Sequence, residues 1–182
     1  MKNILFFATI ALIISACSNQ NSKKTEGNKT ENSVSFSNDM ENASAQIPSW
    51  INEVNVNEGI AHSGKFSCMM DETREYSYAF QEILSNINKE LPKIIIVKAW
   101  VYSTVPSPDA SFIANIFEGG KSIWWNSGVM RDRVPKANEW TEIVCYFKVD
   151  KPVFPTSQIR IFVWNQNKLK FYIDDMDVTF QY

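Results

Sequence analysis

Two adjacent acidic residues near the end of the chain give the clearest indication of chemistry. Asp174 and Asp175 stand together inside an apolar run at residues 171–178. Because successive side chains of a strand point to opposite faces, one of the two carboxylates is expected to meet the protein interior and to need a partner there. Two kinds of partner fit equally well: a hard cation shared with oxygens of an earlier segment, or backbone N–H groups at a strand end.

Catalytic chemistry finds little support in the sequence. The single histidine, His62, lies in the turn-like stretch 61–67, where a structural role is expected, and Ser63 beside it lacks the context of a nucleophile. Asp174 and Asp175 would point to opposite faces of a strand, so they cannot readily flank one glycosidic bond. The sequence also has no Gly-rich phosphate loop and no Cys/His cluster suited to zinc. We therefore expect a binding protein and not an enzyme.

A mixture of aromatic rings and cations recurs on one side of two expected strands, 94–102 and 158–164. Alternate residues of both runs are aliphatic and predict core faces, whereas the residues between them predict outward faces. The outward set comprises Lys98, Trp100, Tyr102, Arg160, Phe162 and Trp164. Flat rings beside hydrogen-bonding groups suit sugars, whose apolar C–H faces stack on a ring while their hydroxyls need polar partners. The alternative is that other parts of the chain cover these rings.

Trp124 and Trp125 add a further candidate ring. Consecutive residues of an extended segment point opposite ways, so one of these two tryptophans is expected to pack inward while the other stays available for a ligand.

Short strands separated by turns dominate the sequence beyond its first part. Residues 94–102, 111–117, 140–149, 158–164 and 169–180 are rich in β-branched and aromatic residues, and turns containing Pro or Gly punctuate them. This pattern predicts an all-β sandwich. One stretch differs, because the apolar residues at positions 80, 83, 84, 87 and 91 have helical spacing and predict a short helix that Pro92 ends.

The first residues predict export from the cell. Lys2 precedes an apolar segment at 4–14 that is too short to span a bilayer, and small residues then lead to Cys17. We interpret residues 1–16 as a lipoprotein signal peptide whose removal leaves Cys17 as an N-terminus carrying acyl chains such as palmitate; the alternatives are an ordinary secretory signal or a short anchor. The acylated cysteine predicts a place in the bacterial cell envelope. Because Ser18 instead of Asp follows the cysteine, we expect the outer membrane where the cell has two membranes. Residues 17–33 carry no large apolar side chain and predict a flexible tether.

One domain is expected over residues 34–182. The sequence has 18 basic and 20 acidic residues, and loss of the segment that contains Lys2 enlarges the acidic excess, which argues against nucleic acid as a partner. Cys68 and Cys145 each lie in an apolar run. The two cysteines could form a disulfide or remain separate buried thiols, and we favour the separate thiols.

Several short motifs, in their order and spacing, resemble the carbohydrate-binding modules of the group that contains families 4, 9, 16 and 22. The motifs are Asn38-Asp39-Met40-Glu41, Trp50, the stretches 61–67 and 97–102, Trp140-Thr141 and Tyr172-Ile173-Asp174-Asp175. The resemblance implies a galactose-binding-like jelly roll that binds glycan without cleaving it. It also implies a calcium ion between the N-terminal segment and the last strand, with Asp39, Glu41, the backbone at Lys65, and Asp174 or Asp175 as ligands.

The same resemblance implies that strands far apart in the sequence can lie side by side. On this basis the outward faces of 94–102 and 158–164 are expected to merge into one glycan platform, with Trp124 or Trp125 nearby. Adhesion or interaction with other envelope proteins is the alternative function, because this fold also serves those roles.

Overall fold

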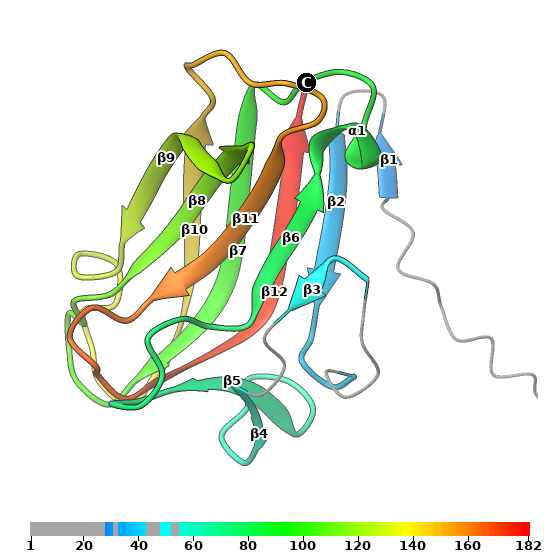
Figure 1. Ribbon diagram of the computed structural model, residues 1–182. Coiled ribbons are helices and arrows are strands. Elements are labelled where there is room, and N and C mark those ends of the chain that lie inside the picture. Colours follow the sequence, from blue (N-terminus) through cyan, green and yellow to red (C-terminus); the bar gives the residue numbers. More distant parts are fainter. Residues whose placement is uncertain (1–27, 31–32, 43–47, 52–54) are drawn as a thin grey trace, which may run out of the picture.

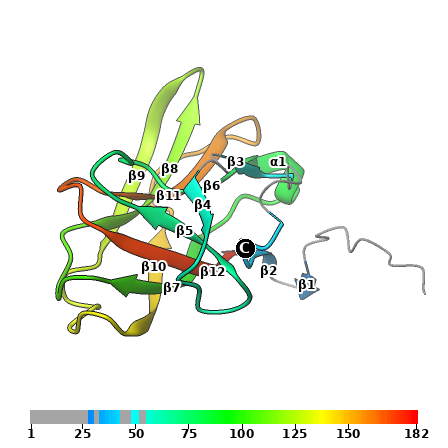
Figure 2. The same cartoon turned by 90° about the horizontal axis from the view of Figure 1, so that it is seen from below.

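Two antiparallel sheets packed face to face make up the described part of the protein (Figure 1). The computed structural model describes residues 28–30, 33–42, 48–51 and 55–182. The seven-stranded sheet contains β1 (Asn28–Thr30), β2 (Ser33–Asn38), β4 (Val56–Glu58), β5 (Phe66–Met70), β7 (Ile94–Ser103), β10 (Trp140–Lys148) and β12 (Phe171–Gln181). The five-stranded sheet contains β3 (Trp50–Ile51), β6 (Ala79–Ile83), β8 (Ser111–Glu118), β9 (Lys121–Val129) and β11 (Gln158–Trp164), and a short helix, α1 (Leu84–Ile87), follows β6. Figure 2 shows the two layers from below, and the predicted all-β sandwich is confirmed.

Strand β12 organises the seven-stranded sheet. One of its edges pairs with β7, while the other pairs first with β5, through residues 171–173, and then with β2, through residues 176–181. The register with β7 shifts between Asp174 and Asp177, where the partner changes from β5 to β2. Asp175 has a φ of 46° at this point. Such an irregularity bends a strand and re-aims its side chains, so the two adjacent aspartates lie at a bend in β12.

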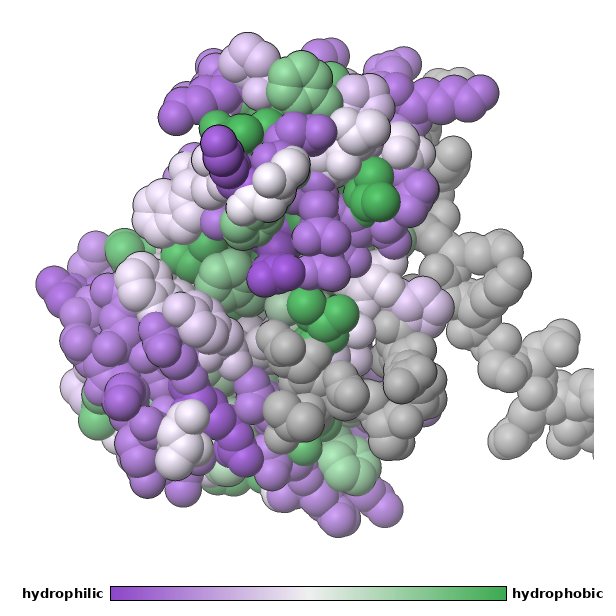
Figure 3. Space-filling model, in the orientation of Figure 1, coloured by the Kyte–Doolittle hydropathy of each residue, from purple (hydrophilic) through white to green (hydrophobic). Residues whose placement is uncertain are grey.

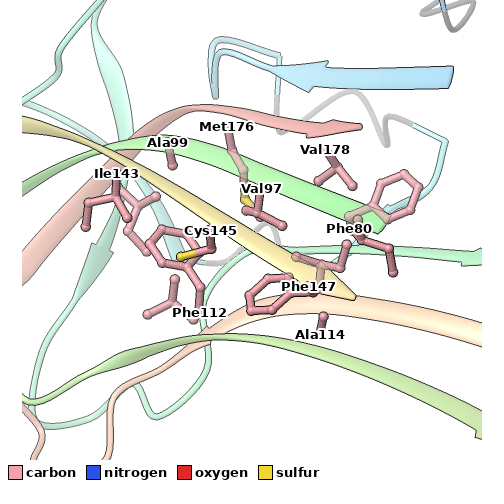
Figure 4. Packing of buried hydrophobic residues seen from close by; sticks show 14 of the residues in the cluster. Phe80, Val97, Ala99, Phe112, Ala114, Ile143, Cys145, Phe147, Met176 and Val178 are labelled. Carbon is pink, nitrogen blue, oxygen red and sulfur yellow. The ribbon is translucent and has the colours of Figure 1, made fainter. Parts of the chain in front are cut away.

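The hydrophobic core fills the space between the sheets. Strand β7 contributes Ile95, Val97, Ala99 and Val101 to it, and β11 contributes Ile159, Ile161 and Val163, each at most 1 % exposed. Figure 4 shows how Phe112, Phe147 and Val178 pack among neighbours from both sheets. Full burial of one such side chain stabilises the fold by about 1.5–3 kcal/mol. The predicted alternation of both strands is confirmed, because the residues between these aliphatic ones are partly exposed.

The helix predicted at 80–91 is wrong for its first half. Residues up to Ile83 belong to β6, which pairs with β11 from Phe80 to Ile83, and the helix covers only Leu84–Ile87. Ile83 and Leu91 are 39 % and 37 % exposed, so they do not share a buried helical face. Pairing with a neighbouring strand has overridden the local helical spacing, as tertiary contacts often do.

The sheet begins earlier than the predicted tether allows. Strand β1 lies within residues 17–33 and pairs with β2 from Asn28 opposite Ser35 to Thr30 opposite Ser33. An edge strand pairs through its backbone groups, so it needs no apolar side chains to form. The predicted signal peptide, residues 1–16, and Cys17 lie outside the described residues. Among the described helices, none has the length and apolar character needed to cross a membrane.

The two cysteines of the domain are separate, buried thiols. Cys68 lies on β5 and Cys145 on β10, both are free, and these two strands do not pair with each other. The backbone N–H of Tyr78 donates to Cys68 Sγ at 3.3 Å, and the Arg133 guanidinium donates to Cys145 Sγ at 2.7 Å. Burial raises the pKa of the Cys68 thiol to about 12. The favoured prediction of unpaired thiols is confirmed.

Candidate functional site

A row of polar and aromatic side chains crosses the outer face of the five-stranded sheet. Trp125 on β9 is paired with Asn115 on β8, which is paired with Arg160 on β11, which in turn faces Gln81 on β6. Residues paired across strands share one face of a sheet. Figure 3 looks onto this sheet, where apolar residues in green are set among polar residues in purple. The pairing of the strands, and not any one motif, brings these four side chains into line.

Two neighbouring hollows lie along this face and form what we call the groove. One has a volume of about 260 Å³ and is lined by Tyr76, Ala79, Phe117, Arg160 and Phe162. The other has a volume of about 410 Å³ and is lined by Ile83, Phe117, Gly119, Gly120, Thr156, Gln158 and Arg160. Phe117 and Arg160 line both hollows, so they stand where the two meet. The groove thus offers rings, amide and hydroxyl groups, and one cation to a ligand.

Arg160 is held in place by an uncharged partner. Its Nε donates to Gln81 Oε1 at 2.8 Å, and one terminal nitrogen donates to the same oxygen. Its guanidinium carbon lies 5.6 Å from the centroid of the Phe117 ring, which is within reach of a cation–π contact. None of the ion pairs among the described residues involves Arg160. The guanidinium is therefore fixed in position without a carboxylate to neutralise it.

Aromatic rings form the other end of the groove. Tyr76 meets Phe162 edge to face, with ring centroids 5.6 Å apart, and is itself 47 % exposed. The Trp164 Nε1 donates to Glu75 Oε1 at 3.1 Å, and an isolated bridge joins Trp164 to Tyr76. The predicted outward residues of β11, Arg160, Phe162 and Trp164, therefore lie together on this face.

The two consecutive tryptophans point opposite ways, as predicted. Trp125 is 50 % exposed on the face that carries the groove, whereas Trp124 is 2 % exposed and its Nε1 donates to Asp150 Oδ1 at 3.1 Å. Trp124 therefore belongs to the core, and its prediction as a ligand-binding residue is wrong.

The predicted single platform does not form. Strands β7 and β11 belong to different sheets, so Lys98, Trp100 and Tyr102 lie on the outer face of the seven-stranded sheet, across the core from the groove (Figure 2). Alternation tells which residues face the core, but not to which sheet a strand belongs. Lys98 makes ion pairs with Glu142 at 3.3 Å and Asp177 at 3.7 Å.

A second aromatic cluster surrounds Trp100 on the seven-stranded sheet. The His62 ring stacks on Trp100 with centroids 3.9 Å apart and an interplanar angle of 11°. Tyr102 packs beside it against Trp140, at 5.6 Å, and Tyr172, at 6.0 Å. His62 thus covers one face of the Trp100 ring. For Trp100, the alternative prediction that the chain covers its own aromatic rings is therefore confirmed.

The loop that carries His62 is fastened to the bend in β12 by Asp174 and Asp175. Asp174 is fully buried, and its Oδ2 accepts the backbone N–H groups of His62 at 2.7 Å and Ser63 at 3.1 Å. Asp175 accepts the Ser63 hydroxyl at 2.7 Å and contacts His62 Nδ1 at 2.6 Å. Burial raises the pKa of the Asp174 carboxyl to about 6. Of the two partners considered for this pair, backbone N–H groups are those present around Asp174.

The other predicted calcium ligands form a separate contact. Glu41 Oε1 accepts the backbone N–H groups of Lys65 and Phe66, each at 2.7 Å, and Asp39 Oδ1 accepts the Glu41 N–H at 3.2 Å. The Lys65 carbonyl oxygen accepts the N–H of Gly59 at 3.0 Å. Within the described ranges, no three His, Cys, Asp or Glu side chains gather closely enough to hold a metal ion. The calcium site stays a prediction, and no step of the function proposed below depends on it.

Sequence reasoning missed several residues of the face that carries the groove. Phe117 and Asn115 alternate with the buried Ile116 and Ala114, so the pattern that identified the outward face of β11 applies to β8 too and would have found them. Tyr76 lies outside any strand, and it reaches the groove through tertiary structure that no local pattern indicates.

Comparison with solved structures identifies the fold. The CBM22-1 xylan-binding domain of Xyn10C from Paenibacillus barcinonensis is 14 % identical, with a TM-score of 0.52, and the match covers 80 % of this chain and 93 % of that domain. The CBM22-2 xylan-binding domain of the same protein is 15 % identical, with a TM-score of 0.50, and the match covers 80 % of this chain and 99 % of that domain. No protein-family model matches the sequence, and no curated protein matches it significantly. The fold is the jelly-roll sandwich of these carbohydrate-binding modules.

Proposed function

We propose that this protein binds a polysaccharide or oligosaccharide in the groove of the five-stranded sheet and does not cleave it. The observation that carries the proposal is the composition of the groove, in which the rings of Tyr76, Phe117 and Phe162 lie beside hydrogen-bonding groups. A pyranose needs a ring for its C–H face and polar groups for its hydroxyls. A concave site with aromatic lining and a few placed polar groups is also the usual form of a small-ligand site.

The comparisons support this proposal at the level of fold. The two matching domains are described as xylan-binding, and a fold shared with binding modules makes binding of some glycan a reasonable first hypothesis. The identity of the sugar does not follow from a fold.

Affinity electrophoresis of the full chain tests the proposal. Native gels containing a sugar-free detergent and one soluble polysaccharide each, with xylan, mannan and β-glucan among them, should retard the protein in at least one case. Phe162→Ala should reduce that retardation, while Tyr146→Ala, at an exposed ring of the other sheet, should leave it unchanged. Equal mobility in every gel would contradict glycan binding.

We propose further that the protein acts at the bacterial cell envelope through an acylated Cys17. The support for this part is the sequence alone: an apolar segment at 4–14 followed by small residues and a cysteine. Anchoring would hold the groove near the polysaccharides of the cell's surroundings.

Protein interaction is the second candidate function. It is favoured by the outer face of the seven-stranded sheet, where Tyr146 is 70 % exposed and Tyr102 and Trp140 lie in the aromatic cluster. Aromatic side chains are enriched at protein interfaces. This function replaces the first if no polysaccharide retards the protein and the wild-type chain captures an envelope protein that the Tyr146→Ala variant does not capture.

A further inference from the structure

Arg160 lies in the groove without an ion-pair partner among the described residues. Of the described residues that line the two hollows, Arg160 is the only charged one. Three acidic residues lie near the groove, and none of them pairs with Arg160. Glu118 accepts the hydroxyls of Thr156 and Ser157, Glu82 accepts Ser49 and Asn86, and Glu75 accepts the Trp164 indole N–H. By contrast, Lys98 on the other sheet has two carboxylate partners. Arg160 therefore makes no ion pair within the described part of the chain.

The free donors, fixed position and partial burial of the Arg160 guanidinium suit it to bind a ligand. Arginine has five N–H donors, and the Arg160 side chain uses two of them in hydrogen bonds to Gln81. Gln81 and Phe117 fix the side chain from two directions, so little conformational freedom is lost when a ligand binds. A half-buried cation is normally paired, because partial removal from water weakens its hydration. The remaining donors suit a planar acceptor with two oxygens.

We infer that the groove recognises an acidic glycan, with the carboxylate of a uronic acid residue pairing with Arg160. This inference rests on the proposed function and adds the class of sugar. The neighbouring rings of Phe117 and Phe162 would stack on the sugar while the guanidinium meets its carboxylate. The chain as a whole has a net charge of −2, so general attraction to a polyanion does not explain such binding.

The test compares each acidic polysaccharide with its own carboxyl-reduced form. Polygalacturonate, alginate and glucuronoxylan serve as probes, because reduction converts each carboxylate to a hydroxymethyl group and leaves the linkages unchanged. The full chain in sugar-free detergent should bind at least one acidic form ten-fold or more tightly than its reduced form. Rising salt should weaken binding to the acidic form more than binding to the reduced form.

Variants assign this preference to Arg160. Arg160→Gln should bring the ratio of the two affinities close to one, and Arg160→Lys should keep only part of it, because lysine lacks the bidentate fork. Lys148→Gln, which removes the same charge from β10 of the other sheet, should leave the ratio unchanged. Trp125→Ala should weaken binding to the acidic form and to the reduced form by the same factor. Far-UV circular dichroism confirms that each variant is folded.

The outcomes separate the two proposals. Equal binding of acidic and reduced forms, or a preference that survives in Arg160→Gln, overturns the uronate inference while glycan binding stands. Binding of no polysaccharide, neutral or acidic, overturns the proposed function and the inference with it.

Discussion

Replacing Trp124 and Trp125 with alanine, one at a time, separates the stability of the sandwich from its binding of glycan. A tryptophan buries about 150–250 Å² when fully covered, and Trp124 is 2 % exposed. At about 25 cal/mol per Å² this area corresponds to about 4–6 kcal/mol as an upper bound. Trp125 is 50 % exposed, so half the area, about 2–3 kcal/mol, is its upper bound. Trp124→Ala also removes the hydrogen bond to Asp150, which adds about 1 kcal/mol.

Binding is expected to respond in the opposite order. Trp125 lies in the row that contains Arg160, and loss of a stacking ring removes about 1 kcal/mol or more of binding free energy. That loss corresponds to about a five-fold or greater rise in Kd. Trp124 faces the core, so Trp124→Ala should keep its affinity as long as the domain is folded.

Urea unfolding followed by far-UV circular dichroism measures the first effect, because tryptophan fluorescence itself changes in these variants. Affinity electrophoresis with the polysaccharide that the wild-type chain binds measures the second. A free energy of unfolding lowered equally by both substitutions would refute the orientation of the two rings. Unchanged affinity in Trp125→Ala would remove β9 from the site.

Three further predictions concern the ends of the domain and the anchor. The pKa of Asp174, raised from 3.8 to about 6 by burial, means that the folded chain holds a proton that the unfolded chain releases. The free energy of unfolding should therefore fall as the pH rises from 3.8 to 6, by at most about 1.4 kcal/mol per pH unit, and urea unfolding of Asp174→Asn should lack this component. Bound calcium should raise the melting temperature above that in chelator, and Glu41→Gln should reduce the gain; coincident melting curves would leave the hydrogen bonds as the only fastening of the segment. Cys17→Ala should release the protein from the membrane fraction into the soluble fraction, and unchanged partitioning would contradict acylation at this residue.

The strands of the sandwich were predictable because their side chains alternate. The aliphatic residues of β7 and β11 are buried and the residues between them are not, since a strand between core and solvent imposes a period of two on the sequence. The same rule separated Trp124 from Trp125. Each of these features depends only on residues close together in the chain.

The arrangement of the site was not predictable from such local patterns. Alternation does not tell which sheet holds a strand, so Trp100 and Arg160 were expected on one platform although they lie on opposite sides of the core. Tyr76 reaches the groove from outside any strand. The helical spacing in 80–91 failed because pairing with β11 holds the first part of that stretch as a strand. Tertiary contacts determine the sheet to which each strand belongs, the place of Tyr76 and the conformation of residues 80–91.

The position of β12 has a consequence for how the chain folds. This strand lies between β7 on one side and β5 and β2 on the other, and its contact with β2 joins the hydroxyls of Ser35 and Thr179 across 144 residues of sequence. Chains dominated by such long-range pairings fold slowly, on the order of milliseconds to seconds. During synthesis, β2 and β7 each keep one unpaired edge until β12 is made. Unpaired strand edges promote aggregation. We therefore expect the unfinished sheet to depend on chaperones until this strand arrives.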